Sequence, residues 1–194
     1  MNTLTQTRHI IPTRIFHALL AGTIVVQLLT SFVFNPDNGG NFAFQVHQYS
    51  GLVAFVAALA FWVVIMTRKI GSSKVLLFPW FNKNCRKDVI ADAKNYARHA
   101  MKLKLPTHDS HAPLASAVHG LGLLLMSAMA ATGTIYYFIN TGNPDAGGMV
   151  GVVMNAHKLL ASLVWAYLIG HASLAVLQHF FGGVKLGSMW SRKS

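Results

Sequence analysis

The sequence predicts an all-α integral membrane protein, a four-helix bundle with both termini in the cytoplasm. Three observations lead to this fold class. Hydrophobic residues make up 53% of the 194 residues and charged residues only 11%, whereas a water-soluble domain carries about 25% charged residues. Four apolar blocks each exceed the roughly 20 residues that cross a hydrocarbon core. Nearly all basic residues lie outside these blocks and on one side of them.

The four predicted spans are separated by polar connections of two kinds. Two connections, "NPDNGGN" and "NTGNPDAGG", are turn sequences without lysine or arginine. The third connection, residues 67–113, is long, polar and basic. We therefore expect one transmembrane domain over residues 1–194. Its spans cover about residues 15–34, 42–66, 114–139 and 150–181, and the last is long enough to tilt or to project from the bilayer.

The distribution of basic residues predicts the orientation. Fifteen of the 16 lysines and arginines lie before the first span, in 67–113 or after the last span, and Lys158 is the exception. The positive-inside rule then places both termini and the long loop in the cytoplasm. A net charge of +11 could indicate a nucleic-acid partner. However, the charges lie between apolar blocks, as expected for loops beside anionic lipids, so we expect no nucleic acid.

Two segments have alternative interpretations. The N-terminal segment has basic residues before an apolar core, as a cleaved signal peptide does. No A-x-A site follows Phe34, and the first span contains His17 and Gln27, so we expect a retained span. In the long loop, "DVIADAKNYARHAMKLKL" is typical of a basic amphipathic helix on the membrane surface. A solvated loop helix explains that pattern equally well.

Histidines within the apolar blocks are the informative residues, because ionisable side chains are costly in a membrane. The predicted topology places His17 near the cytoplasmic side and both His47 and His157 near the outer face. His171 follows His157 by fourteen residues, which corresponds to about 21 Å along a helix. Fourteen steps of about 100° fall about 40° short of four full turns, so both lie on one helix face.

These depths pair His47 with His157 at the outer level and His17 with His171 at the inner level. A single membrane histidine could equally have a hydrogen-bonded packing role. For these four, depth and facing agree independently. Imidazole is a common axial ligand of haem iron, and helix bundles build cofactor sites from inward-facing side chains. The sequence therefore predicts two b haems, each held by one histidine pair.

The remaining histidines are assigned other roles. His119 and His179 lie towards the cytoplasmic side and could replace His17 or His171 as ligands. We expect them instead to support a haem ligand or to contact a haem propionate. Four further histidines lie in polar segments and are expected to be solvated: His9, His99, His108 and His111.

Small and basic residues beside these positions also have two interpretations. Glycines near the histidines would let a flat macrocycle approach the backbone, although small residues also pack membrane helices against each other. Lys158, adjacent to His157, could pair with a propionate or polarise a quinone or an anionic substrate. Extension of its side chain to the lipid headgroups is the interpretation that we prefer. The glycines concerned are Gly51, Gly120, Gly122 and Gly170.

Several motifs that would indicate other chemistry are absent from the sequence. The single cysteine, Cys85, cannot form an internal disulfide, and without a CxxCH motif no c-type haem can be attached. There is no phosphate-binding loop, HExxH motif or Ser–His–Asp set, so the haems would carry the chemistry. A histidine-lined metal transporter would require acidic or thiolate partners in the spans. All five acidic residues lie in predicted loops or at helix ends.

The chain resembles the superfamily of bacterial cytochrome b561 and nickel–iron hydrogenase cytochrome b. The resemblance covers all four spans through "RIFHALLAG", "VHQYSGL" and "HKLLASLVWAYLIGHASLAVLQHFF". It implies that His17, His47, His157 and His171 are the haem ligands and that the protein lies in a bacterial inner membrane. It also implies electron transfer connected with the quinone pool. Two features depart from it: Ala18 replaces an aromatic residue found in many relatives, and the 67–113 loop is longer than in compact members.

Two functions follow from this resemblance. The preferred one is a di-haem b-type cytochrome that passes electrons across the membrane between a redox partner and the quinone pool. In this interpretation it is the membrane subunit of a respiratory oxidoreductase, because the long loop resembles that of dehydrogenase cytochrome subunits. The alternative is a stand-alone oxidoreductase, similar to a superoxide oxidase, that uses the outer haem. A stable companion subunit or soluble cytochrome would favour the first, and turnover by the isolated chain the second.

Overall fold

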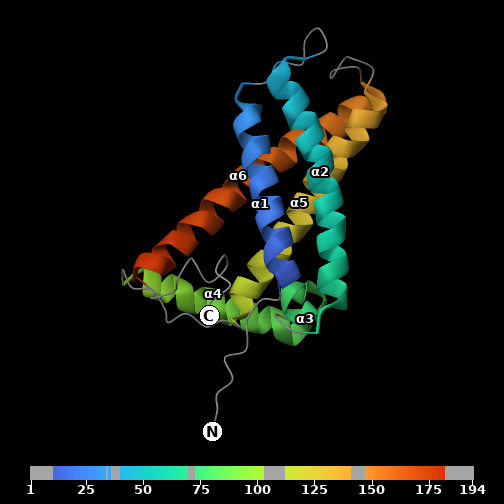
Figure 1. The fold of residues 1–194 in the computed structure, drawn as a ribbon. Coiled ribbons are helices and arrows are strands. Elements are labelled where there is room, and N and C mark those ends of the chain that lie inside the picture. The colour runs from blue at the N-terminus through green and yellow to red at the C-terminus, as the bar shows by residue number, and fades with distance from the viewer. Residues whose placement is uncertain are drawn as a thin grey trace. The chain divides into compact units, whose positions relative to one another are not determined.

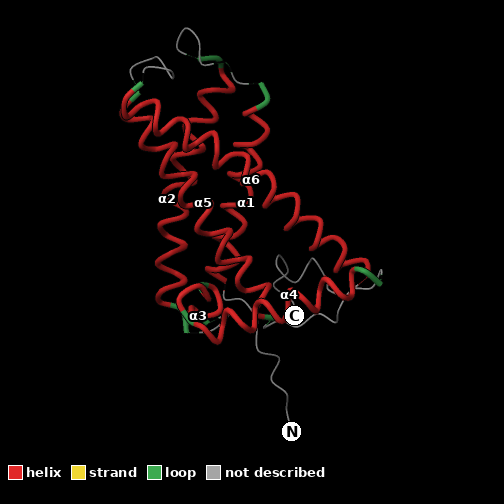
Figure 2. Tube along the Cα trace, turned by 180° about the vertical axis from the view of Figure 1, so that it is seen from behind, coloured by secondary structure: helices red, strands yellow, loops and turns green. Residues whose placement is uncertain are grey.

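The computed structural model confirms the predicted all-helical fold class (Figures 1 and 2). It describes residues 11–33, 35, 40–69, 73–102, 112–140 and 147–181. Within these ranges, four helices are long and apolar enough to cross a membrane. They are α1 (Ile11–Ser31), α2 (Phe42–Thr67), α5 (Pro113–Ile139) and α6 (Gly148–Phe181). The chain is therefore a multi-pass membrane protein.

The helix boundaries differ modestly from the predicted spans. α1 begins at Ile11, four residues before the predicted start, and includes Pro12 in its first turn, where a missing backbone N–H costs no helical hydrogen bond. The predicted orientation stays a prediction, since both termini lie outside the described residues. Also outside them are five of the fifteen basic residues counted for the orientation and three of the histidines expected to be solvated: Arg8, Lys104, Lys185, Arg192, Lys193, His9, His108 and His111.

Between α2 and α5 the long loop contains regular structure. It comprises α3 (Lys74–Leu77), the 3-10 helix η2 (Pro79–Phe81) and α4 (Lys83–Ala100). The predicted amphipathic helix thus begins at Lys83 and not at residue 88. Asn82 explains the earlier start, because its side-chain oxygen accepts hydrogen bonds from the backbone N–H groups of Asn84 and Cys85 at 2.9 and 3.2 Å.

The chain forms two compact units. The first unit contains residues 1–14, 65–122 and 168–194, and the second contains residues 15–64 and 123–167. Each long helix contributes one segment to each unit. The description of residues 1–194 as a single cytochrome b domain stays a prediction.

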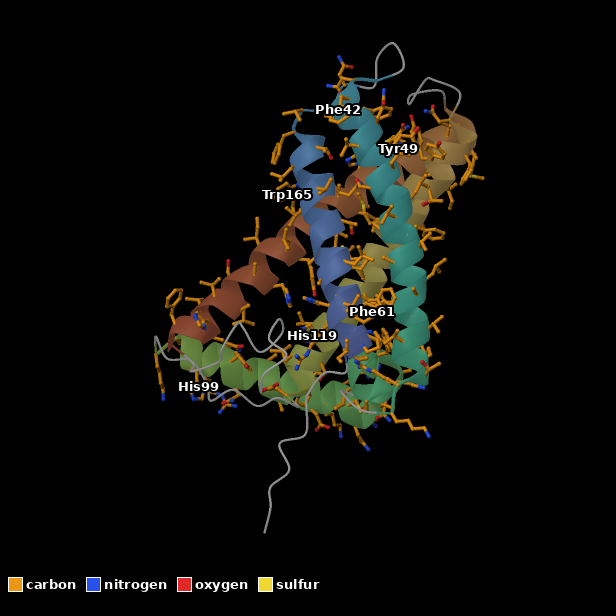
Figure 3. The ribbon with its side chains drawn as sticks, in the orientation of Figure 1. Phe42, Tyr49, Phe61, His99, His119 and Trp165 are labelled. Atoms are coloured by element: carbon orange, nitrogen blue, oxygen red, sulfur yellow. The ribbon has the colours of Figure 1, made fainter. Side chains whose placement is uncertain are left out.

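The second unit is held by small residues and aromatic contacts. Ala57 and Ala58 of α2 are buried, which allows the close helix approach typical of membrane bundles. Phe61 stacks on Phe16 of α1 with ring centroids 6.3 Å apart, and Figure 3 marks Phe61 on α2. The indole N–H of Trp62 donates a hydrogen bond to the Ser127 hydroxyl at 2.9 Å. These contacts link α1, α2 and α5 within this unit.

The first unit packs the loop elements against the ends of α5 and α6. The backbone of α3 approaches α5 so closely that a methyl group at Gly120 would overlap the carbonyl oxygen of Leu77. Asp92 of α4 accepts a hydrogen bond from the backbone N–H of Leu114 at 3.1 Å, which caps the start of α5. Gln178 of α6 donates to the Tyr96 hydroxyl at 3.3 Å. No residue of α4, which the structure describes in full, is buried.

Candidate functional site

Two histidines of the second unit face each other from different helices. His47 lies one and a half turns into α2, and His157 lies in the first third of α6. Their ring centroids are 6.5 Å apart, and the ring planes are nearly perpendicular at 82°. Both side chains are half-buried. The structure therefore brings together the pair that the sequence assigned to the outer level.

A threonine contacts each of the two imidazole rings. The Nδ1 atom of His47 is 3.0 Å from the Thr30 hydroxyl of α1. The Nδ1 atom of His157 is likewise 3.0 Å from the Thr132 hydroxyl of α5. The two contacts have the same length and use the same ring nitrogen. Each ring is thus oriented by a helix other than its own.

Gln27 of α1 fixes the backbone of α2 beside His47. Its side-chain amide donates hydrogen bonds to the carbonyl oxygen of His47 at 2.5 Å and to the Ser50 hydroxyl at 2.7 Å. A Cβ atom at Gly51 would lie 3.4 Å from this amide nitrogen. Gly51 therefore leaves room for Gln27 as much as for any ligand.

A cavity of about 460 Å³ lies between the two rings and their helices. This volume is within the range of small-molecule and cofactor sites. The lining is mainly aliphatic and aromatic and includes Met126, Tyr136 and Trp165; Figure 3 marks Trp165 on α6. Lys158 also contributes to the lining and is itself exposed. An apolar cavity with few polar groups favours a large, mainly apolar cofactor over a hydrated ion.

The geometry of the two rings fits a metal held between them. With metal–nitrogen bonds of about 2 Å and roughly 1 Å more from each nitrogen to its ring centre, two imidazoles on opposite sides of one metal have centres about 6 Å apart. The observed separation is 6.5 Å. Since both Nδ1 atoms contact threonines, Nε2 is the nitrogen that each ring would offer. These residues thus suit a bis-imidazole haem.

The other predicted ligand pair is divided between the two units. His17 belongs to the second unit and His171 to the first, so this pair stays a prediction. Within the first unit, the ring of His171 lies against that of His119 on α5, with centroids 5.4 Å apart and planes at 74°. Figure 3 marks His119 in this unit. His179 stacks edge-on against its neighbour Phe180.

The remaining predicted positions have different surroundings. His99 bonds to the backbone oxygen of Asn95 within α4, at 2.9 Å, and is half-buried. Gly170 has no atom within 4 Å of an added Cβ, so it does not mark a close helix contact. A Cβ atom added to Gly133 would lie 3.0 Å from Cε1 of His157. The sequence did not indicate this glycine.

The family model of the prokaryotic cytochrome b561 matches residues 8–192. The chain belongs to this family. Membership identifies it as a membrane protein that binds haem b and transfers electrons. Comparison with curated proteins and with solved structures returns no match. The family thus accounts for a b-type haem, which is the cofactor that the paired rings and the apolar cavity suit.

Three residues beside the two imidazole rings were not predicted from the sequence: Thr30, Thr132 and Gly133. Polar residues inside apolar spans can indicate function, and both threonines are polar residues of this kind. Threonine, however, is also common as a helix-packing residue in membranes. Spacing along one helix does not reveal which threonine meets a histidine of another helix.

Proposed function

We infer that this cytochrome is a di-haem electron carrier of a bacterial inner membrane, built as one membrane domain of residues 1–194. His47 and His157 are the axial ligands of the outer haem, and His17 and His171 are those of the inner haem. Electrons pass across the membrane between a redox partner and the quinone pool, with the chain as the membrane subunit of a respiratory oxidoreductase.

The observation that carries this proposal is the opposed pair of His47 and His157 across an apolar cavity. Ring separation, the contacted Nδ1 atoms and the cavity volume all suit one haem. The inner pair is supported by the sequence, through the fourteen-residue spacing between His157 and His171 and the position of His17 near the start of α1. Histidines at two depths give two haems whose separation spans much of the bilayer.

A bound b haem supplies a one-electron couple, and the protein determines its potential and access. In the second unit, Thr30 and Thr132 hold the two rings, and Gln27 fixes the helix backbone next to one of them. Buried Tyr136 and the half-buried Trp165 line the cavity and give it a largely apolar, polarisable wall. An apolar, polarisable surrounding favours one-electron transfer over side reactions with water.

Haem quantitation combined with quinone kinetics tests this function. The purified chain should contain about two b haems with a low-spin reduced-minus-oxidised spectrum. Its haems should be reduced by a quinol analogue or oxidised by a quinone analogue within the turnover time of respiratory enzymes. A chain that holds only one haem contradicts the di-haem proposal. A chain with two haems that exchange no electrons with either analogue contradicts the quinone connection.

One observation favours the stand-alone alternative. Lys158 is exposed, lines the same cavity as His157 and is the lone basic residue on the predicted outer side. A cation there would attract a small anionic reactant such as superoxide to the outer haem. The Lys158→Met variant should then slow superoxide oxidation several-fold and make it less dependent on ionic strength. Unchanged kinetics in this variant removes the alternative's structural support.

A further inference from the structure

Thr30 and Thr132 occupy equivalent positions relative to their two histidines. Each hydroxyl is also bonded to the preceding turn of its own helix. The Thr30 hydroxyl donates to the carbonyl oxygen of Val26 at 2.8 Å, and the Thr132 hydroxyl donates to that of Ala128 at 3.0 Å. A second carbonyl oxygen lies 3.0 Å from each hydroxyl, on Gln27 and Met129 respectively.

These bonds determine which nitrogen of each imidazole carries a proton. A hydroxyl has one proton and two acceptor sites, whereas a carbonyl oxygen can only accept. The single proton of each threonine is therefore directed to the backbone carbonyls of its own helix. The hydroxyl oxygen then accepts in its 3.0 Å contact with the histidine, so Nδ1 is the donor. The backbone carbonyl of Gln27 is a further hydrogen-bond partner of His47, and that of Met129 is one of His157. Because a carbonyl oxygen only accepts, these bonds also make the ring the donor. In a neutral imidazole with a proton on Nδ1, the lone pair belongs to Nε2.

We propose that Thr30 and Thr132 are positioning residues that fix His47 and His157 as Nδ1–H tautomers with nearly perpendicular ring planes. Nε2 of both rings would then be directed to the same haem iron. This inference rests on the proposed function, since it presumes that this pair holds the outer haem. A hydrogen-bond partner on the second nitrogen of a ligating histidine fixes the ring and raises its basicity. Each threonine would hold one of the two histidines that bind the same haem.

The first test replaces each hydroxyl by a methyl group of equal size, as Thr30→Val and Thr132→Val. An acceptor on Nδ1–H makes Nε2 a stronger donor and stabilises ferric over ferrous iron. Each valine variant leaves its histidine with only the backbone carbonyl as acceptor, so it should raise the midpoint potential of one haem and leave the other unchanged. A tenfold change in the ferric-to-ferrous preference corresponds to about 59 mV for one electron, and we expect a rise of up to this size from each variant.

Thr23 offers a matched control on α1. It lies two turns before Thr30, is buried, and donates to the carbonyl oxygens of Leu19 and Leu20 at 3.0 Å. It is not part of the cavity lining. Thr23→Val thus removes an equivalent hydroxyl without touching a histidine and should leave both potentials unchanged. Thr30→Ser and Thr132→Ser keep the acceptor and should retain the wild-type potential.

Two further measurements report on the imidazole rings directly. Both can be made even where a valine variant loses part of its haem. The ferric EPR anisotropy depends on the angle between the imidazole planes, so it should change in both valine variants and persist in the serine variants. In the diamagnetic ferrous state, the Nδ1–H proton of each ligand should exchange with solvent at least tenfold faster without its threonine. The haem affinity of each valine variant should fall about tenfold.

The outcomes separate this inference from the proposed function. If the wild-type chain lacks b haem, or if His47→Ala and His157→Ala retain both haems, the ligand assignment is wrong. If the ligands are as proposed but Thr30→Val and Thr132→Val match Thr23→Val in potential, EPR anisotropy and proton exchange, the positioning role alone is wrong. Shifts on two different haems would also overturn it, because both threonines are assigned to one.

Discussion

The two units of the chain treat their histidines differently. In the second unit, the rings of His47 and His157 are 6.5 Å apart, and each is tied by Nδ1 to a threonine hydroxyl. In the first unit, the ring of His171 lies 5.4 Å from that of His119. That distance is shorter than the roughly 6 Å expected for two imidazoles on opposite sides of one metal.

The difference in centroid distance distinguishes two rings that could bind one metal from two rings that only lie beside each other. A metal between two rings requires a set distance between the ring centroids and one nitrogen on each ring directed at the same point. The rings of His47 and His157 in the second unit have the required centroid distance. The rings of His119 and His171 meet at 74°, close to the 82° between His47 and His157, so the centroid distance and not the ring angle distinguishes the two pairs. The proposed function pairs His171 with His17 and gives His119 a supporting role.

The largest expected effect is a loss of haem, and it should distinguish His171 from His119 in the first unit. Replacing His171 by alanine removes an axial ligand, so haem content should fall from about two to about one per chain. Replacing His119 by alanine removes only a ring neighbour, so both haems should remain, with at most a small shift in one potential. Haem quantitation of the two purified variants checks this, and loss of a haem in His119→Ala with retention in His171→Ala reverses the assignment.

In the first unit, a methyl group added at a closely packed glycine should lower the stability of the protein. In Gly120→Ala the new methyl group meets the carbonyl oxygen of Leu77, and a backbone atom cannot move aside cheaply. We expect a loss of about 1–3 kcal/mol in stability, as for overpacked cores, measured as a lower Tm in detergent. Gly170→Ala, where no atom lies within 4 Å, is the control. Equal Tm values for the two variants would contradict the close packing of α3 on α5.

A methyl group at residue 133 should act on the haem more than on stability. It would lie 3.0 Å from Cε1 of His157, and a ring edge can rotate by a few tenths of an ångström. Gly133→Ala should therefore shift the absorption maximum and potential of one haem with a smaller fall in Tm than Gly120→Ala. Gly151→Ala, with open space around the new methyl group, should leave the spectrum unchanged. An unaltered spectrum in Gly133→Ala would show that the site accommodates the methyl group without moving His157.

The smallest effects should come from hydrogen bonds remote from the rings. Trp62→Phe removes the bond to Ser127 in the second unit, and Tyr96→Phe removes the bond from Gln178 in the first. Such bonds contribute about 0.6 kcal/mol on average in membrane proteins. Both variants should keep two haems and show slightly lower stability in a denaturant titration. A haem lost from either would extend the cofactor site beyond the residues assigned here.

The sequence predicted the parts of the fold that depend on hydrophobicity and length. The four spans, including the long α6, follow from apolar blocks that exceed the bilayer thickness. The start of α4 at Lys83 was missed because capping by Asn82 acts over two or three residues and leaves no periodic pattern. The short α3 was missed for a similar reason, since four residues are too few to show a helical period.

The sequence predicts the candidate haem ligands, but it does not predict the residues that hold those ligands in place. His47 and His157 stand out because histidine is rare in apolar spans, and depth can be counted along each helix. Thr30 and Thr132 are ordinary residues of membrane helices, and their role depends on how α1 turns towards α2 and α5 towards α6. Those rotations follow from packing between helices, which a single sequence does not encode in a readable pattern.

The central claim is that His47 and His157 hold the same haem. Potentiometric titration of His47→Ala and His157→Ala, each compared with the wild-type chain, tests it most directly. We predict that each variant retains one haem, that the two remaining haems have the same midpoint potential and spectrum, and that this potential matches one of the two wild-type values. Variants that lose different haems, or that retain both, would contradict the claim.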